Sequence, residues 1–290
     1  MKKVLITGAG GQLGSSMELK DFMMITSSRF HTDDVESPTF DADLDITNED
    51  QVKTVISEND PDIIVHLAAM TNVDGCERNP EQAHLINIKG TENLLNNFSG
   101  KFIFVSSDYV FDGENGPYSE VDEVNPINIY GTTKLKGEES VRRLSFDWVI
   151  IRTNVVWNIG GNFKASFADW VLVELQNNRN IRIVDDQWNN PTHTEDLGSV
   201  INELLKHEAS GLYHYGSAEV LNRYDFARLI ANIYNLDENL IEPITTQELN
   251  QLAKRPLKSG LKTNKIERDF AIIPSVLRED IEKMALRVLK

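Results

Sequence analysis

A tyrosine and a lysine form the strongest candidate for acid–base chemistry in this 290-residue chain. Tyr130 and Lys134 are four residues apart, a spacing that places two side chains on one face of a helix. An ammonium group beside a phenol favours the phenolate, so we expect the pKa of Tyr130 to lie below its usual value of about 10. Such a pair can exchange a proton with an oxygen bound to carbon. Lys136 falls on another face of the helix and is not the partner of Tyr130. Exposed surface helices also contain the Tyr-x-x-x-Lys spacing, so the surrounding elements decide whether this pair is catalytic.

A glycine-rich loop follows the first expected strand. Residues 2–7 predict a buried strand around the apolar run Val4-Leu5-Ile6, and glycines follow at positions 8, 11 and 14. Glycine lets the backbone turn tightly and approach a pyrophosphate, which then sits at the N-terminus of the next helix. Its place between a strand and a helix argues against an ordinary turn. We therefore predict that a dinucleotide is bound by Gly8, Gly11, Gln12, Leu13 and Gly14.

The end of the second expected strand indicates which dinucleotide it is. NAD enzymes usually place an acid there for the ribose hydroxyls, whereas this chain has Ser27, Ser28 and Arg29. Two hydroxyls and a guanidinium suit a 2′-phosphate, so we predict NADPH, with NADH as the alternative. Asp33 and Asp34 lie about 20 residues beyond the glycine loop, at the spacing of the acid, but past the strand.

Strands and helices alternate through the first half of the chain. We expect strands at residues 2–7, 21–27, 40–46, 62–67, 101–106 and 147–152, and helices at 82–97 and around Tyr130. This alternation predicts an α/β fold of the Rossmann type, with a right-handed, doubly wound parallel sheet. Ligands bind such sheets at the carboxyl ends of the strands. We therefore expect Ser107 to contact the substrate oxygen that Tyr130 protonates, and small residues after position 67 to pass close under the cofactor.

The alternation stops after residue 157. We expect helices at 162–176, 194–207 and 222–234, a loop at 182–194, a strand at 211–215, and a small helical unit from 242 that closes with a helix at 274–289. The predicted division is an NAD(P)-binding domain of residues 1–155 with about 180–232. A substrate-binding domain, mainly helical, takes about 156–179 and 233–290.

Composition excludes several classes of function. The formal charge is 29 − 45 = −16, so the chain has no electrostatic footprint for nucleic acid or an anionic membrane. One cysteine, Cys76, excludes an internal disulfide and a cysteine-based zinc cluster. The chain begins with a strand-like run, and we find no signal peptide and no apolar run that could span a bilayer. We therefore expect a cytoplasmic protein.

Taken together, these segments resemble the extended short-chain dehydrogenase/reductase superfamily, and within it the dTDP-4-dehydrorhamnose reductase family. The likeness covers nearly the whole chain, through residues 11–14, 66–74, 107–113, 125–138, 151–153, 186–187, 191–192, 196–197 and 255–265. It implies that NADPH or NADH gives a hydride to C4 of a 4-keto-6-deoxy sugar on a nucleotide diphosphate, a step of dTDP-L-rhamnose biosynthesis. Tyr130 would then protonate the oxygen, Lys134 would tune Tyr130 and hold the nicotinamide ribose, and Ser107 would orient the carbonyl.

The resemblance also implies further contacts. Asp45 and Ile46 would meet the adenine, and the remaining cofactor contacts would be Leu67, Ala68, Ala69, Thr71 and Ser106. The substrate would contact Val73, Ser107, Asp108, Tyr109, Val155, Asn162 and Arg255. A guanidinium presents a fork of donors that suits the diphosphate. The family allows a homodimer.

This chain departs from the family at one position. Members that make rhamnose carry a sugar-contacting tryptophan where this chain has Val155, and Trp157 is offset by two residues. The acids of a magnesium site found in some members are not recognisable here, so we predict no metal.

Other functions remain open. In dehydratases of the superfamily, an Asp-Glu pair follows the active-site serine or threonine. Here Asp108 is followed by Tyr109, which argues against a dehydratase. The alternatives are an epimerase of the superfamily, which would keep its cofactor bound through purification, and a non-catalytic NADP-binding subunit like the regulatory β subunit of methionine adenosyltransferase.

Overall fold

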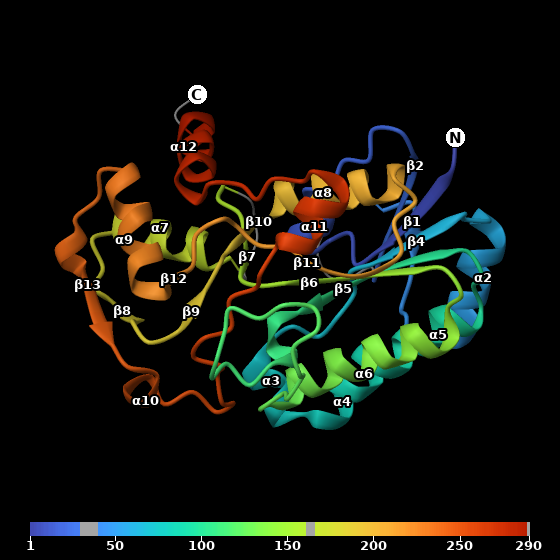
Figure 1. Cartoon of the computed structure of the whole chain (residues 1–290), viewed down its shortest axis with the longest axis horizontal. Coiled ribbons are helices and arrows are strands. Elements are labelled where there is room, and N and C mark those ends of the chain that lie inside the picture. Colours follow the sequence, from blue (N-terminus) through green and yellow to red (C-terminus); the bar gives the residue numbers. More distant parts are fainter. Residues whose placement is uncertain (30–39, 161–165, 289–290) are drawn as a thin grey trace.

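A parallel sheet forms the centre of the molecule (Figure 1). Within residues 1–29, 40–160 and 166–288, which the computed structural model describes, seven parallel strands follow the order β11-β6-β5-β4-β1-β2-β3. Their bounds are β1 Lys3–Thr7, β2 Met23–Ser28, β3 Ala42–Asp43, β4 Ile63–His66, β5 Lys101–Ser107, β6 Trp148–Thr153 and β11 Gly211–His214. The order reverses between β1 and β4, the point where doubly wound sheets bind ligands. The predicted Rossmann-type sheet is confirmed.

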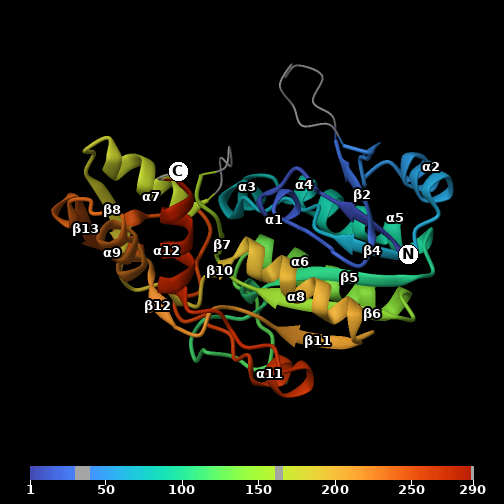
Figure 2. The same cartoon turned by 90° about the horizontal axis from the view of Figure 1, so that it is seen from above.

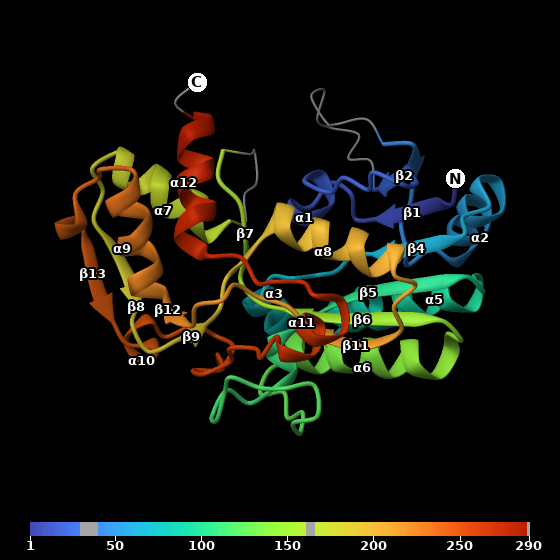
Figure 3. The ribbon, with the colours of Figure 1, turned by 45° about the horizontal axis from the view of Figure 1, so that its top comes forward.

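Helices cover both faces of this sheet, because alternate residues of each strand point to opposite sides. Val4 and Ile6 pack with α8 (Thr194–Lys206), whereas Leu5 packs against the other layer. That layer holds α2 (Glu49–Asn59), α5 (Thr91–Asn96) and α6 (Ile129–Leu144). Figure 3 shows α8 on one side of the sheet and α5 and α6 on the other.

Two elements differ from their expected form. The strand expected at 40–46 is only the two-residue edge strand β3. The helix expected at 82–97 is three consecutive pieces, α4 (Pro80–His84), a π-helical turn at Leu85–Gly90 and α5. In the π-helical turn, the Asn87 side chain bonds both backbone groups of Met70, with Met70 N–H donating at 2.7 Å and Asn87 Nδ2 donating to Met70 O at 3.1 Å. Because Met70 follows β4, this contact fastens the helix to the edge of the sheet that binds ligands.

A second unit stands beside the sheet, with its own apolar core (Figure 2). It contains α7 (Phe167–Gln176), α9 (Arg223–Ile233) and α12 (Leu277–Val288), with β8 (Ile181–Val184) paired in parallel to β13 (Ile241–Ile244). The expected loop at 182–194 therefore contains β8 and the two-residue strands β9 (Trp188–Asn189) and β10 (Thr192–His193). Residues of β8 and α9, which we expected in the cofactor domain, pack in this second core because their apolar side chains face α7 and β13.

The remaining helices are short. They are α1 (Gln12–Ser15), α3 (Val73–Arg78), α10 (Thr246–Leu249) and α11 (Asn264–Phe270). Among the described residues, every helix is too short or too polar to cross a lipid bilayer.

Candidate active site

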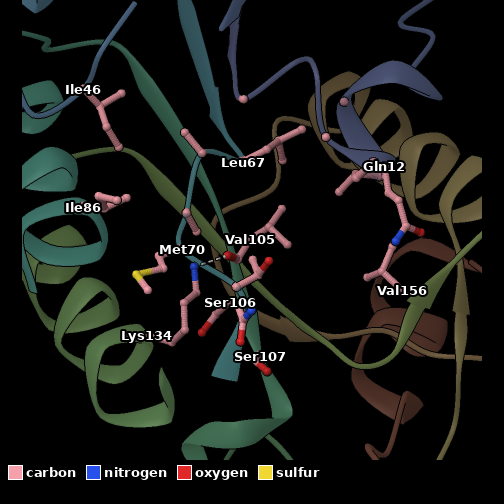
Figure 4. Close-up of a pocket in the computed structure, with 18 of the residues that line it drawn as sticks. Gln12, Ile46, Leu67, Met70, Ile86, Val105, Ser106, Ser107, Lys134 and Val156 are labelled. Atoms are coloured by element: carbon pink, nitrogen blue, oxygen red, sulfur yellow. Dashed lines mark hydrogen bonds between the residues drawn. The ribbon is translucent and has the colours of Figure 1, made fainter. Parts of the chain in front are cut away.

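A cavity of about 880 Å³ lies along the carboxyl ends of β1, β2, β4, β5 and β6. Figure 4 shows side chains from these strand ends and from α6 gathered around it. It is lined by the predicted residues Gly8, Gly11, Gln12, Leu13, Gly14, Ser28, Arg29, Asp45, Ile46, Leu67, Ala68, Ala69, Thr71, Ser106, Ser107, Tyr130, Lys134 and Val155. Its other lining residues, which sequence reasoning missed, are Leu44, Thr47, Met70, Asn72, Ile86, Val105, Thr153, Asn154 and Val156. Most of these neighbour a predicted residue in the chain.

The glycine loop closes one end of the cavity. Gly8 has a φ of +73°, and a Cβ there would lie 2.7 Å from the backbone nitrogen of Ala68. A Cβ on Gly14 would lie 2.6 Å from Cα of Ala9. Only glycine fits at both positions, and it leaves the backbone N–H groups at the start of α1 facing the cavity, where a phosphate group can be bound.

The candidate 2′-phosphate site consists of two of the three predicted residues. Ser28 and Arg29 line the cavity, and Arg29 Nη1 lies 3.9 Å from Asp45 Oδ2, an open and partly exposed contact. Ser27 was a wrong prediction: it is fully buried, and its hydroxyl donates to the carbonyl oxygen of Ile6 at 3.0 Å. Strand alternation explains this, since neighbouring residues of β2 face opposite sides. Asp33 and Asp34 lie outside the described residues.

Helix α6 carries the candidate acid–base pair. The Asn128 side chain caps the helix by accepting from Gly131 N–H at 2.8 Å, so the predicted helix is confirmed and Tyr130 occupies its first turn. Lys134 does not hydrogen-bond Tyr130; its ammonium donates to the carbonyl oxygen of Val105 at 2.7 Å. Burial lowers the pKa of Lys134 to about 8, and the nearby carboxylate of Glu138 opposes that shift.

The predicted lowering of the Tyr130 pKa by Lys134 was wrong. Burial raises the pKa of the Tyr130 hydroxyl, and a hydrogen bond with Ser107 only partly offsets this. Tyr130 therefore holds its proton at neutral pH. This is the form that an acid needs when it protonates an oxygen.

The Ser107 side chain is held in place by the two residues that follow it in the chain. Its hydroxyl donates to Asp108 Oδ1 at 2.9 Å and accepts from Tyr109 N–H at 3.2 Å. The other oxygen of Asp108 accepts from the Ser259 hydroxyl at 2.5 Å. Burial raises the pKa of Asp108 to about 6, and the hydrogen bonds from Ser259 and Ser107 oppose this rise. Asp108 thus fixes the Ser107 rotamer.

Four predicted substrate residues do not line this cavity: Val73, Asp108, Tyr109 and Arg255. The Tyr109 ring meets Tyr130 edge-on, with ring centres 5.7 Å apart, and Arg255 Nη2 donates to Asp74 Oδ1 at 2.9 Å. Their contact with the sugar or its diphosphate stays a prediction, and Asn162 lies outside the described residues. Trp157 is fully buried with its ring centre 4.7 Å from that of His193, so it belongs to the core.

Sequence reasoning also missed Arg223, the first residue of α9. Its guanidinium lies over the Phe167 ring, 5.0 Å from the ring centre, and interacts electrostatically with Asp108 and Tyr109. Among the residues that the structure describes, it has neither a salt bridge nor a hydrogen bond. Burial lowers the pKa of this guanidinium. A single arginine at the start of a helix gives no sequence signal, because its surroundings come from distant segments.

The fold and the site together define an NAD(P)-dependent oxidoreductase of the short-chain dehydrogenase/reductase type, with a glycine loop at the first strand and a Ser–Tyr–Lys set at the strand ends. Its known relatives agree. The chain belongs to the family described as "RmlD substrate binding domain", whose model matches residues 1–289.

Individual relatives match over most of their length. The chain is 34% identical to a dTDP-4-dehydrorhamnose reductase of Aggregatibacter actinomycetemcomitans, over 95% of each chain. It is 30% identical to the methionine adenosyltransferase 2 subunit beta of Danio rerio, over 92% of this chain and 84% of that protein. A crystal structure of the Bacillus anthracis dTDP-4-dehydrorhamnose reductase with NADP superposes with a TM-score of 0.88, at 31% identity, and covers 99% of this chain and all of that one.

Proposed function

We propose that this protein uses NADPH to reduce the C4 keto group of a nucleotide-linked 4-keto-6-deoxy sugar, as dTDP-4-dehydrorhamnose reductase does in dTDP-L-rhamnose biosynthesis. One observation carries the proposal: Tyr130 of α6 and Ser107 at the end of β5 line the same cavity that the glycine loop closes, with the Ser107 hydroxyl held by Asp108. The reductases among its relatives support the substrate class.

The residues of this chain orient the keto group of the substrate and donate a proton to its oxygen. When bound, NADPH provides the hydride. The Tyr130 hydroxyl donates its proton to the oxygen at C4, because its raised pKa keeps it protonated until negative charge develops on that oxygen. Ser107 donates to the same oxygen when its hydroxyl proton turns from Asp108 Oδ1 towards the substrate. The Lys134 ammonium stabilises the negative charge that forms on Tyr130 as its proton leaves. It donates one hydrogen bond to Val105, and its other N–H groups are donors for the ribose.

The second unit is the proposed substrate domain. We place its contribution at α9, where Arg223 supplies a guanidinium that forms no salt bridge with the described residues, although it feels the charge of Asp108. A guanidinium in low-polarity surroundings favours an anionic partner, which the sugar diphosphate provides. Arg255, also proposed for the diphosphate, must share its charge with Asp74.

We also propose that the protein is a homodimer and that it is cytoplasmic, and gel filtration with light scattering tests the homodimer. A monomer at micromolar concentration would overturn it.

The test of the function is NADPH oxidation, followed by absorbance, with dTDP-4-keto-6-deoxy-L-lyxo-hexulose supplied by the upstream enzymes. We expect saturable turnover with NADPH that is lost in Tyr130→Phe. Tight NADPH binding without turnover would overturn the reductase proposal. It would favour a regulatory protein like the methionine adenosyltransferase subunit to which the chain is also similar.

A further inference from the structure

A third ionisable residue lies on the same side of α6 as the acid–base pair. Tyr130, Lys134 and Glu138 follow one another at intervals of four residues, so they occupy successive turns of one face of the helix. The Glu138 side chain is fully buried, and it does not line the cofactor cavity. Because a glutamate is almost never fully buried unless it is paired, its partners indicate what it does.

The Glu138 carboxylate accepts four hydrogen bonds. Its Oε1 accepts from Ser106 Oγ at 2.6 Å and from Arg152 Nε at 2.8 Å. Its Oε2 accepts from Arg152 Nη2 at 2.8 Å and from Arg142 Nη2 at 3.2 Å. Both oxygens are therefore fixed in position, and a negative charge lies at a defined point inside the protein.

The bond from Ser106 connects Glu138 with the active site. Ser106 lines the cavity and directly precedes Ser107, which is expected to orient the substrate carbonyl. The ammonium of Lys134, one helical turn away from Glu138, donates to the carbonyl oxygen of Val105. Figure 4 shows Lys134 extending towards this end of the strand. Glu138 and Lys134 thus both attach α6 to the last residues of β5.

Glu138 also acts on Lys134 through its charge. The Lys134 ammonium is buried, and it lies 4.1 Å from the centre of the Phe104 ring. Burial favours the neutral amine, whereas the negative charge of Glu138 favours the ammonium. The carboxylate therefore supports the charged form of the lysine that the acid–base pair requires.

Other ionisable groups around α6 do not supply this negative charge. Burial, and then the charge of Lys134, lower the pKa of His66 in β4 to about 3, so this imidazole is neutral. Glu92 of α5 pairs with basic side chains at the helix surface. Glu77 of α3 accepts from the first backbone N–H of α6 at 3.1 Å, and Asp108 acts on Tyr130 instead.

Stability alone is a weak reason to bury these charges. Arg152 is only 2% exposed, and its guanidinium lies 5.0 Å from the centre of the Phe111 ring and 3.4 Å, through Nη1, from His214 Nε2. A buried ion pair loses the hydration of both charges, and apolar residues of similar size often stabilise a fold as well or better. The ion pair of Glu138 with Arg152 lies at the strand ends beside the active site, which points to a role there.

We infer that Glu138 is a positioning residue for the reaction: its buried carboxylate holds Ser106 at the end of β5 and keeps the ammonium of Lys134 charged at neutral pH. The inference rests on the proposed function, because it concerns the lysine of the proposed acid–base pair. Glu138 contacts neither cofactor nor substrate in this role and acts through Ser106 and Lys134.

The experiment measures the NADPH affinity of the full-length protein by fluorescence titration between pH 6 and pH 10. In the wild type we expect the affinity to fall above about pH 8, where Lys134 loses its charge. Lys134→Met should bind NADPH more weakly and should lack this fall. In Glu138→Gln the fall should begin about one pH unit lower, because loss of a nearby opposite charge favours the neutral amine.

Two further variants separate the effect of charge from that of packing. Glu139→Gln removes the exposed acid next to Glu138 and should match the wild type. Arg142→Gln removes a cation, 36% exposed, that bonds the Glu138 carboxylate. The negative charge is then less compensated, so the fall should begin at a higher pH. Loosened packing does not produce shifts in opposite directions. If Glu138→Gln does not fold, Arg142→Gln still decides.

Turnover with the sugar substrate should show the same shift. We expect kcat/KM of Glu138→Gln to stay within about threefold of the wild-type value at pH 6.5. At pH 9 it should be about tenfold lower, as a pKa lowered by about one unit requires. Glu139→Gln should follow the wild-type profile at both pH values.

Two results would overturn the inference. One is an NADPH curve that falls at the wild-type pH in both Glu138→Gln and Arg142→Gln. The other is a loss of affinity in Glu138→Gln that is equal at every pH, which would leave Glu138 a purely structural role. If the wild type shows no turnover while the NADPH curves shift as expected, the proposed function fails and the role of Glu138 towards Lys134 stands.

Discussion

The ammonium group of Lys134 donates a hydrogen bond of 2.7 Å to the carbonyl oxygen of Val105 (Figure 4). This bond attaches the lysine of α6 to the strand that ends in Ser107 and so helps to fix the acid–base helix relative to the substrate-orienting hydroxyl. The ammonium also lies 4.1 Å from the centre of the Phe104 ring. The ammonium therefore lies in largely apolar surroundings, and this burial lowers its pKa, so it loses its proton more readily than an exposed lysine does.

The first prediction concerns pH. Because burial lowers the pKa of Lys134 to about 8, the charged form is present below that pH and is lost as pH rises through it. We expect kcat/KM for the sugar to be level near pH 7 and to fall above about pH 8, since kcat/KM reports the free enzyme. Lys134→Met should remove most of the activity, whereas Lys136→Met, an exposed lysine of the same helix, should keep it. A profile level to pH 10 would contradict the assignment.

The second prediction concerns Tyr130. Tyr130→Phe removes the proton donor but keeps the ring that meets Tyr109 edge-on. We expect kcat to fall by about 10²–10⁴-fold, the usual contribution of a general acid. NADPH affinity, measured by fluorescence titration, should change by less than about twofold. Activity near the wild-type level would show that another group donates the proton.

The third prediction concerns cofactor choice. Arg29→Ala removes the guanidinium that faces the cavity beside Asp45. Hydrogen bonds to charged groups contribute about 1.5–3 kcal/mol, so NADPH affinity should fall about 10–100-fold while NADH affinity stays nearly constant. Ser27→Ala is the matched control, because its hydroxyl bonds Ile6 inside the sheet. It should leave the NADPH/NADH ratio unchanged. Equal losses for both cofactors in Arg29→Ala would refute the 2′-phosphate site.

Local patterns were enough to predict the sheet, the glycine loop and the helix of Tyr130. Each depends on neighbours in the chain, such as the apolar run of β1 or the Asn128 cap. The direction of the Lys134 ammonium was not predictable, because it depends on a carbonyl of β5 that lies far away in the sequence. The surroundings of Arg223 and the pairing of β8 with β13 were not predictable either, because both depend on segments that are distant in the sequence. Ser27 was misplaced for a simpler cause: the sequence shows where a strand ends but not which residue faces the ligand.

The last prediction concerns the contact that sets the position of α6. A Cβ on Gly131 would lie 2.0 Å from the carbonyl oxygen of Tyr109, so only glycine lets the first turn of the helix approach this loop. Gly131→Ala should push Tyr130 away from Ser107 and lower kcat more than it weakens NADPH binding. Overpacking of this kind costs about 1–3 kcal/mol. Urea unfolding measures that loss.

Gly198→Ala is the control for helix propensity. It lies inside α8, and the nearest atom to its added Cβ is Cα of Met17 at an ordinary 3.6 Å. Because alanine favours a helix interior over glycine by about 0.5–1 kcal/mol, this variant should be slightly stabilised and fully active. If both variants behaved alike, the close approach of Gly131 to Tyr109 would not be what positions Tyr130.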